Sequence, residues 1–200
     1  MKKIIDLIIS YKFFLPIVIF YEFIFVLLGY RGNNIIIRNN EISTDTIPCP
    51  YYFLCKIHKN IKSYKIKSFT DIGCGDGRVI DFFSKKTPIK LIGYELFNDS
   101  FISCQNKFKN NKNISIYNSN FFNSFDKLAL SDCYFINDPV KDTNLHNDLF
   151  SNFLKTLTSL NPVYFILVNV SNDKRQIFNN LDLLIEYRVG TRGFYIYKYN

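Results

Sequence analysis

The chain has 200 residues, of which 48% are hydrophobic and 21% charged, so it can bury the core of one globular domain. Its formal net charge is +8, but the lysines are scattered and form no Arg-rich block, so nucleic acid is not the expected partner. The five cysteines form no CxxC pair and there are two histidines, which excludes an obvious zinc site and favours reduced thiols in the cytosol.

The N-terminus is strongly apolar. The run FFLPIVIFYEFIFVLLGY begins at Phe13, carries Glu22 as its one charge and has about the length that a bilayer requires. Because bulky aromatic residues fill its end where a cleaved signal peptide would have small ones, we expect an uncleaved anchor helix over residues 1–31. A charge such as Glu22 is costly inside a bilayer, so a helix in the membrane plane is an alternative. A buried core helix packed on the domain is another.

A polar linker over residues 32–50 separates this helix from a domain over residues 51–200. In that domain, short apolar runs alternate with segments of helical periodicity. The predicted strands are residues 67–73, 89–95, 113–120, 132–138, 163–170, 183–189 and 193–199, and the predicted helices are residues 78–86, 100–110, 145–160 and 173–180. This alternation predicts an α/β fold with a doubly wound, seven-stranded, mostly parallel sheet. The closing pair of strands is a hairpin signal, which makes the last strand antiparallel.

A glycine-rich turn follows the first predicted strand. In DIGCGDGR, Gly73, Gly75 and Gly77 allow a tight turn and close approach of the backbone to a ligand. The site lies at the carboxyl end of a strand, where ligands bind in such sheets. The spacing differs from the GxGxxG of dinucleotide sites. Asp71 would repel a pyrophosphate but attract an ammonium and a sulfonium, so the pattern predicts a cationic adenosyl ligand.

This stretch resembles motif I of the class I S-adenosylmethionine-dependent methyltransferases, and the resemblance covers essentially Ile47 to Asn200. It implies S-adenosyl-L-methionine as the cofactor, with Asp71 and the three glycines at its methionine part. It implies that Glu95, which closes the second strand, accepts hydrogen bonds from both ribose hydroxyls and that Leu96 lies beside the adenine. Asn120, where the family usually has an acid, would face the adenine amino group, with Phe121 next to it.

The fourth predicted strand ends in INDPV, where this superfamily commonly places residues that meet the acceptor. Asn137 and Asp138 are therefore the candidate catalytic residues, and Asp138 would orient or deprotonate an ammonium or hydroxyl nucleophile. A turn or helix N-cap role explains Asp138 equally well. Val140 replaces the aromatic residue of amino-methylating members, which weakens adenine or glutamine as the acceptor. His58 and His146 are weaker candidate bases and are expected more often at the surface.

The Pro- and Tyr-containing segment IPCPYYFLCKI, together with GDGR, resembles some membrane-anchored protein lysine methyltransferases. Tyr51 and Tyr52 would then border the cofactor, although such aromatic residues are more often core. Arg78 is expected as a solvated or bridging charge at a helix start.

We therefore expect a membrane-anchored methyltransferase that needs no metal and whose catalytic domain faces the cytoplasm. It would act on a protein acceptor, with lysine as one candidate. A small-molecule, lipid or envelope-sugar acceptor is an alternative, and so is a non-catalytic, cofactor-binding module tethered to a membrane. Methyl transfer by in-line displacement depends on positioning more than on side-chain chemistry, so the sequence predicts the cofactor better than the acceptor.

Overall fold

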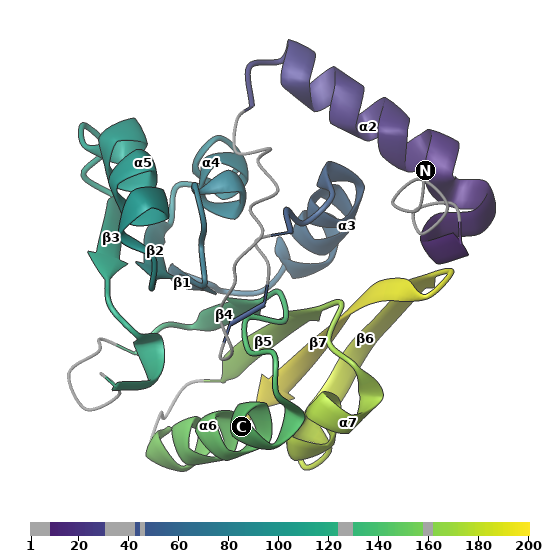
Figure 1. The fold of residues 1–200 in the computed structure, drawn as a ribbon, viewed down its shortest axis with the longest axis vertical. Coiled ribbons are helices and arrows are strands. Elements are labelled where there is room, and N and C mark those ends of the chain that lie inside the picture. Colours follow the sequence, from purple (N-terminus) through teal and green to yellow (C-terminus); the bar gives the residue numbers. More distant parts are fainter. Residues whose placement is uncertain (1–8, 31–42, 45–46, 124–129, 158–161) are drawn as a thin grey trace.

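The computed structural model describes residues 9–30, 43–44, 47–123, 130–157 and 162–200. Its centre is a seven-stranded sheet in the order β3-β2-β1-β4-β5-β7-β6, with helices on both faces (Figure 1). The strands are β1 (Ser68–Ile72), β2 (Lys90–Glu95), β3 (Ile114–Asn118), β4 (Cys133–Ile136), β5 (Val163–Val168), β6 (Asp182–Val189) and β7 (Arg192–Tyr199). Strands β1 to β5 pair in parallel, and β7 is antiparallel to both β5 and β6. The predicted α/β fold and its antiparallel last strand are confirmed.

Two helical layers cover the sheet (Figure 1). Helices α3 (Tyr51–Ile61), α4 (Arg78–Ser84) and α5 (Asn98–Phe108) lie over one face, and α6 (Thr143–Thr156) and α7 (Asn172–Arg175) over the other. Short 3₁₀ turns occupy Lys12–Phe14, Phe121–Asn123 and Gln176–Phe178. Because side chains alternate along a strand, Phe135 of β4 joins the core on the α3 and α4 side, whereas the adjacent Tyr134 joins the core under α6.

Helix α3 has no counterpart among the elements predicted above. Pro50 is its N-cap residue, so the prolines that indicate a linker in the sequence lie directly before a helix. Proline is tolerated at this place because the first amides of a helix need no partner within it. The aromatic residues at the start of α3 are buried in the core.

The N-terminal helix α2 (Leu15–Leu27) packs outside α3, and the chain just before it lies by the turn between β6 and β7 (Figure 1). Within the described residues, Ile9–Leu27 is the one helical stretch long and apolar enough to cross a membrane. Of its most apolar window, 22% is buried. The segment is therefore not an enclosed core helix, although one of its faces packs against the domain.

Candidate functional site

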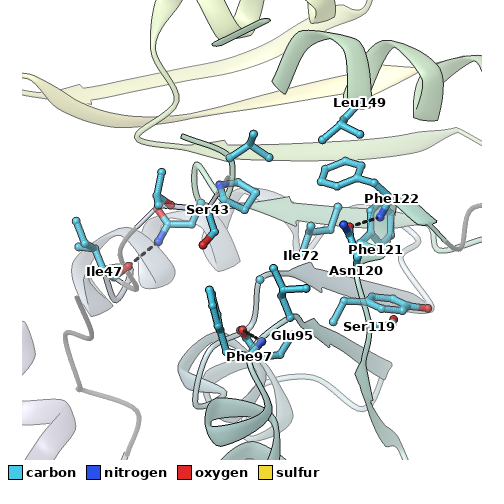
Figure 2. Close-up of a pocket in the computed structure, with 17 residues that line it drawn as sticks. Ser43, Ile47, Ile72, Glu95, Phe97, Ser119, Asn120, Phe121, Phe122 and Leu149 are labelled. Carbon is cyan, nitrogen blue, oxygen red and sulfur yellow. Dashed lines mark hydrogen bonds between the residues drawn. The ribbon is translucent and has the colours of Figure 1, made fainter. Parts of the chain in front are cut away.

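A cleft opens at the carboxyl ends of β1, β2 and β4, where the strand order reverses. It contains about 820 Å³ of empty space, part of which is open solvent. Figure 2 shows Ser43 and Ile47 on one side of the cleft and Phe121 and Phe122 on the other.

The glycine turn forms part of the cleft wall. Gly73, Gly75 and Gly77 have φ angles of 79°, 55° and 86°, in the left-handed region that favours glycine. Gly73 lines the cleft, and a Cβ added there would lie 3.4 Å from Cβ of Pro139. At Gly77 an added Cβ would lie 2.7 Å from Sγ of Cys104 in α5. Gly77 thus lets α4 approach α5, whereas the Cβ at Gly73 would make an ordinary contact.

Glu95, at the end of β2, lines the cleft and is only 5% exposed. Its Oε2 accepts a hydrogen bond from the backbone N–H of Gly75 at 2.7 Å. Its Oε1 accepts one from the N–H of Phe97 at 2.9 Å (Figure 2). These backbone donors fix the carboxylate between the glycine turn and the cleft.

Asp71 lies in β1 and is 2% exposed. Its Oδ2 has no hydrogen-bond partner in the part of the chain that the structure describes. Burial, and then the negative charge of Glu95, raises the pKa of Asp71 to about 8. A buried carboxylate oxygen without a partner is unfavourable, and a bound cation would supply the missing partner. This orphaned oxygen and the glycine turn therefore fit an adenosyl ligand that carries an ammonium group.

Three further predicted cofactor residues line the cleft, whereas Asp71, Gly75 and Gly77 are not among its lining residues. Leu96, Asn120 and Phe121 all line it, and Leu96 is 43% exposed. Phe121 is 3% exposed and packs edge-on against Tyr94. Oδ1 of Asn120 accepts the backbone N–H of Phe122 at 3.0 Å (Figure 2). Among the described residues this is the one hydrogen bond of the Asn120 side chain, whose amide has two donor hydrogens and a second acceptor position.

The loop after β4 places the two candidate catalytic residues differently. Asn137 lines the cleft, and its Nδ2 donates to the carbonyl of Ile47 at 2.8 Å (Figure 2). Asp138 has a φ of 44°, and its Oδ1 accepts from Nζ of Lys174 at 2.7 Å. Lys174 is 5% exposed and also donates to the carbonyl of Val140 at 2.6 Å. Of the described loop residues, Asn137, Pro139 and Val140 line the cleft, and Asp138 pairs with Lys174 beside it.

Residues of the predicted linker line one side of the cleft, a placement that no pattern in the sequence predicts. Ser43 forms a β-bridge with Val140. Oγ1 of Thr44 donates to the carbonyl of Asp138 at 2.6 Å, and the N–H of Thr44 donates to that of Pro139 at 3.3 Å. We call residues 43–47 the strap, of which the structure describes 43, 44 and 47. Three of its residues therefore hold the loop after β4.

Tyr51, Tyr52 and Arg78 lie away from the cleft, under helix α2. The ring of Tyr51 stacks on Phe25 of α2 with centroids 4.6 Å apart. The guanidinium of Arg78 lies 3.8 Å from the centroid of the Tyr51 ring and forms an ion pair with Glu22. Glu22 also accepts the N–H of Tyr51 at 2.8 Å. Arg78, the first residue after the glycine turn, is thus a bridging charge between α2 and α4.

Neither histidine lines the cleft that the structure describes. His146 is fully buried rather than at the surface, because α6 turns it against Phe150, with ring centroids 4.5 Å apart. Neither ring nitrogen has a hydrogen-bond partner among the described residues. Burial, and then the charge of Lys174, lowers the pKa of His146 to about 4. His58 lies on α3, edge-on to Phe82, where burial lowers its pKa.

No profile of a known protein family and no curated protein sequence matches this chain. Its fold is similar to that of solved methyltransferases. An RNA methyltransferase from Salinibacter ruber, in complex with S-adenosyl-L-homocysteine, aligns with a TM-score of 0.58 at 12% identity, over 76% of this chain and 93% of that chain.

A putative methyltransferase from Escherichia coli aligns with a TM-score of 0.60 at 13% identity, over 74% of this chain and 85% of that chain. A putative O-methyltransferase from Klebsiella pneumoniae aligns with a TM-score of 0.59 at 11% identity, over 77% of this chain and 82% of that chain. Identities this low show the fold alone. The chain therefore has the fold of the class I S-adenosylmethionine-dependent methyltransferases, as the motif-based resemblance predicts.

Proposed function

We propose that this protein is a methyltransferase that binds S-adenosyl-L-methionine in the cleft at the carboxyl ends of β1, β2 and β4. The observation that carries the proposal is the arrangement of Gly73 and Glu95 on the cleft wall, next to the buried Asp71 carboxylate with its unpartnered oxygen. The complex of the Salinibacter ruber enzyme with S-adenosyl-L-homocysteine supports the assignment, because that protein shares the fold.

Each residue has a proposed role in holding the cofactor. Glu95 accepts hydrogen bonds from the ribose hydroxyls, with its carboxylate already oriented by two backbone donors. Asp71 gives up its proton and pairs with the ammonium group. Leu96 and Phe121 contact the adenine, and Asn120 bonds to its polar edge. The left-handed conformations at Gly73, Gly75 and Gly77 shape the turn around the methionine part.

The bound cofactor supplies a methyl group activated by a sulfonium. The residues of the cleft then need to hold an acceptor in line behind that methyl and exclude water. Asn137 is the proposed polar contact to the acceptor, because its amide lines the cleft together with Pro139. For Asp138 the ion pair with Lys174 favours a positioning role, in which it fixes the loop that carries Asn137. Its direct participation in proton transfer stays a prediction.

The acceptor is proposed to be a protein at a membrane, with a lysine amine as the first candidate. The apolar N-terminal helix and the resemblance of GDGR and its upstream segment support this choice. Placement of the domain on the cytoplasmic side follows from where the cofactor is found. The acceptor side of the cleft also has room for a small molecule, so the experiment must separate the two classes.

Methyl transfer from labelled S-adenosyl-L-methionine to membranes of the source cell would test the proposal. The full-length protein is incubated with these membranes, and the label is then measured in protein, extractable lipid and soluble fractions. Label in a protein band, recovered as methyl-lysine after hydrolysis, is the expected result. Label in lipid or a soluble product would identify the other acceptor class. A wild-type protein that binds the cofactor but labels no fraction would favour the non-catalytic module, and Glu95→Gln provides the background.

A further inference from the structure

The N-terminal helix has two apolar faces, of which the domain covers one. Buried or half-buried positions recur every three or four residues at Leu15, Val18, Glu22 and Phe25, so these share one face of the helix. Tyr21 and Ile24 are also half-buried, and Ser10 and Tyr11 are buried just before the helix. The spacing is that of a helix packed along its length against a protein surface.

Contacts hold this face from one end of the helix to the other. Near its start, the carbonyl of Ser10 accepts the N–H of Thr191 from the β6–β7 turn at 3.0 Å. In its middle, Glu22 pairs with Arg78. After its end, the carbonyl of Gly29 accepts from Nζ of Lys85 at 3.3 Å. The helix is therefore fixed along the surface of the domain.

The opposite face of α2 is apolar and uncovered. Phe20 is 60% exposed and Leu27 67%, and Phe13, in the 3₁₀ turn just before α2, is 95% exposed. From residue 13 to residue 28 the sequence has a single charge, that of Glu22, and this side chain turns toward the domain. A helix at the surface of a water-soluble domain normally presents polar residues outward. A contiguous apolar face of this kind marks a surface that contacts a partner or a membrane.

The charges around this face match an anionic lipid surface. Lys12 is exposed next to Phe13, and Arg192 lies close enough to Tyr11 for its charge to lower the pKa of that side chain against the larger effect of burial, which raises it. At the other end, Lys85 lies over the ring of Tyr30. Glu22 is paired with Arg78, and Asp81 is paired with both Lys85 and Lys107, so the cations outnumber this acid. Cations at both ends of an apolar stripe are typical of helices that lie at a bilayer interface.

We infer that α2 stays docked on the catalytic domain and lies in the plane of a lipid bilayer, with Phe13, Phe20 and Leu27 inserted at the boundary between headgroups and acyl chains. This inference rests on the membrane attachment in the proposed function and specifies its geometry. It does not depend on methyl transfer.

The docking contacts oppose a spanning arrangement. To cross the roughly 30 Å hydrocarbon core, the helix would have to leave the domain along most of its length. Undocking would deprive Arg78, which is 6% exposed, of its carboxylate partner. It would also expose the rings of Tyr51 and Phe82, which Phe25 now covers. The loss of this ion pair and the exposure of an aromatic cluster are both unfavourable.

Depth-dependent fluorescence quenching distinguishes the two arrangements. The chain has no tryptophan, so Phe13→Trp, Phe20→Trp and Leu27→Trp each introduce a single probe into the full-length protein. The probe membranes are vesicles of phosphatidylcholine and phosphatidylglycerol in equal amounts, with bromine at different depths of the acyl chain. We expect all three tryptophans to be quenched at one shallow depth. Tyr117→Trp, at a half-exposed site on β3, is the matched control and should not be quenched.

A deep position for the probe at residue 20, with those at 13 and 27 near opposite interfaces, would overturn the inference in favour of a spanning helix. The inference would also be overturned if the folded protein did not bind the vesicles in a flotation assay. If such a protein formed dimers without lipid, the apolar face would be assigned to a second copy of the chain. Binding of S-adenosyl-L-homocysteine, measured on the same samples, separates these outcomes from a failure of the proposed enzyme activity.

A second set of variants tests whether the exposed apolar face of α2 binds the lipid. Phe20→Ser combined with Leu27→Ser should lower partitioning into these vesicles at least about tenfold, because two exposed apolar side chains no longer enter the lipid. The exposed control Tyr117→Ser should leave partitioning unchanged. Equal partitioning of the double variant and the control would contradict the assignment.

Discussion

Replacement of Glu22 by glutamine tests whether the N-terminal helix is an integral part of the domain. The side chain of Arg78 is 7% exposed, so removal of its carboxylate partner leaves a nearly buried cation. Breaking a buried ion pair from one side destabilises a protein by about 3–5 kcal/mol. Because the side chain of Glu22 is 33% exposed, water screens part of the interaction, and we expect a loss of about 2 kcal/mol in the free energy of unfolding.

Glu22→Ala should be more damaging than Glu22→Gln. Glutamine keeps an oxygen that can accept the N–H of Tyr51, whereas alanine leaves that donor without its partner and adds about 1 kcal/mol. Urea unfolding of the full-length protein, followed by circular dichroism, measures both losses. In the double variant Glu22→Gln with Arg78→Met, the cation is gone as well, so part of the lost stability should return.

The matched control for this prediction is Glu186→Gln. Glu186 forms an ion pair with Arg188 at 3.8 Å, and both side chains are about half exposed. Such a surface pair contributes roughly 0–1 kcal/mol, so the control should unfold almost as the wild type does. If Glu22→Gln were no more destabilising than Glu186→Gln, the docking of α2 through Arg78 would be refuted.

Three further predictions concern buried groups. Because the pKa of Asp71 is raised from 3.8 to about 8, the folded state holds its proton across that interval, and the free energy of unfolding should fall as pH rises from about 4 to about 8. In urea titrations at several pH values, Asp71→Asn should not show this fall. The same pH dependence of the free energy of unfolding in the variant and the wild type would contradict the prediction. Because the pKa of His146 is lowered from 6.5 to about 4, the free energy of unfolding should instead fall as pH falls through that interval. In the same assay, His146→Phe should not show this loss of stability at low pH. Gly77→Ala should lower the free energy of unfolding by about 2–3 kcal/mol, since its Cβ would press on Cys104. Gly29→Ala, which shares the positive φ but has open space around it, should lose about 1 kcal/mol, and equal losses would refute the packing argument.

Much of the fold could be predicted from local patterns. The alternation of strands and helices determines a parallel sheet, and the carboxyl ends of parallel strands meet at one edge. For this reason the glycine turn after β1 and Glu95 at the end of β2 could be expected in one site, and both Gly73 and Glu95 line the cleft. A few neighbouring residues are enough to predict a strand that ends in a carboxylate, or a turn that needs positive φ angles.

Contacts between distant residues could not be predicted in this way. Thr44 of the strap bonds to a residue 94 positions away, and Lys174 pairs with Asp138 across 36 positions. Neither leaves a periodicity in the sequence. The burial of His146 depends on how α6 rotates toward Lys174, which one histidine in an amphipathic segment does not reveal.

Glu22 shows the same limit. In the sequence it weakens the case for a membrane helix, because a charge inside a bilayer is costly. In the structure it turns toward Arg78 on the domain, and the outer face of α2 stays apolar. The sequence alone does not show which partner a charged side chain in an apolar helix will find.

Calorimetric titration of S-adenosyl-L-homocysteine into the full-length protein tests the central claim most directly. We expect saturable binding at one site, weakened about tenfold to hundredfold by Glu95→Gln, since a hydrogen bond to a charged group contributes about 1.5–3 kcal/mol. Glu186→Gln, on the exposed hairpin, should bind as the wild type does. The absence of binding by the folded wild-type protein, or equal affinity in Glu95→Gln, would contradict the assignment of the cleft as the cofactor site.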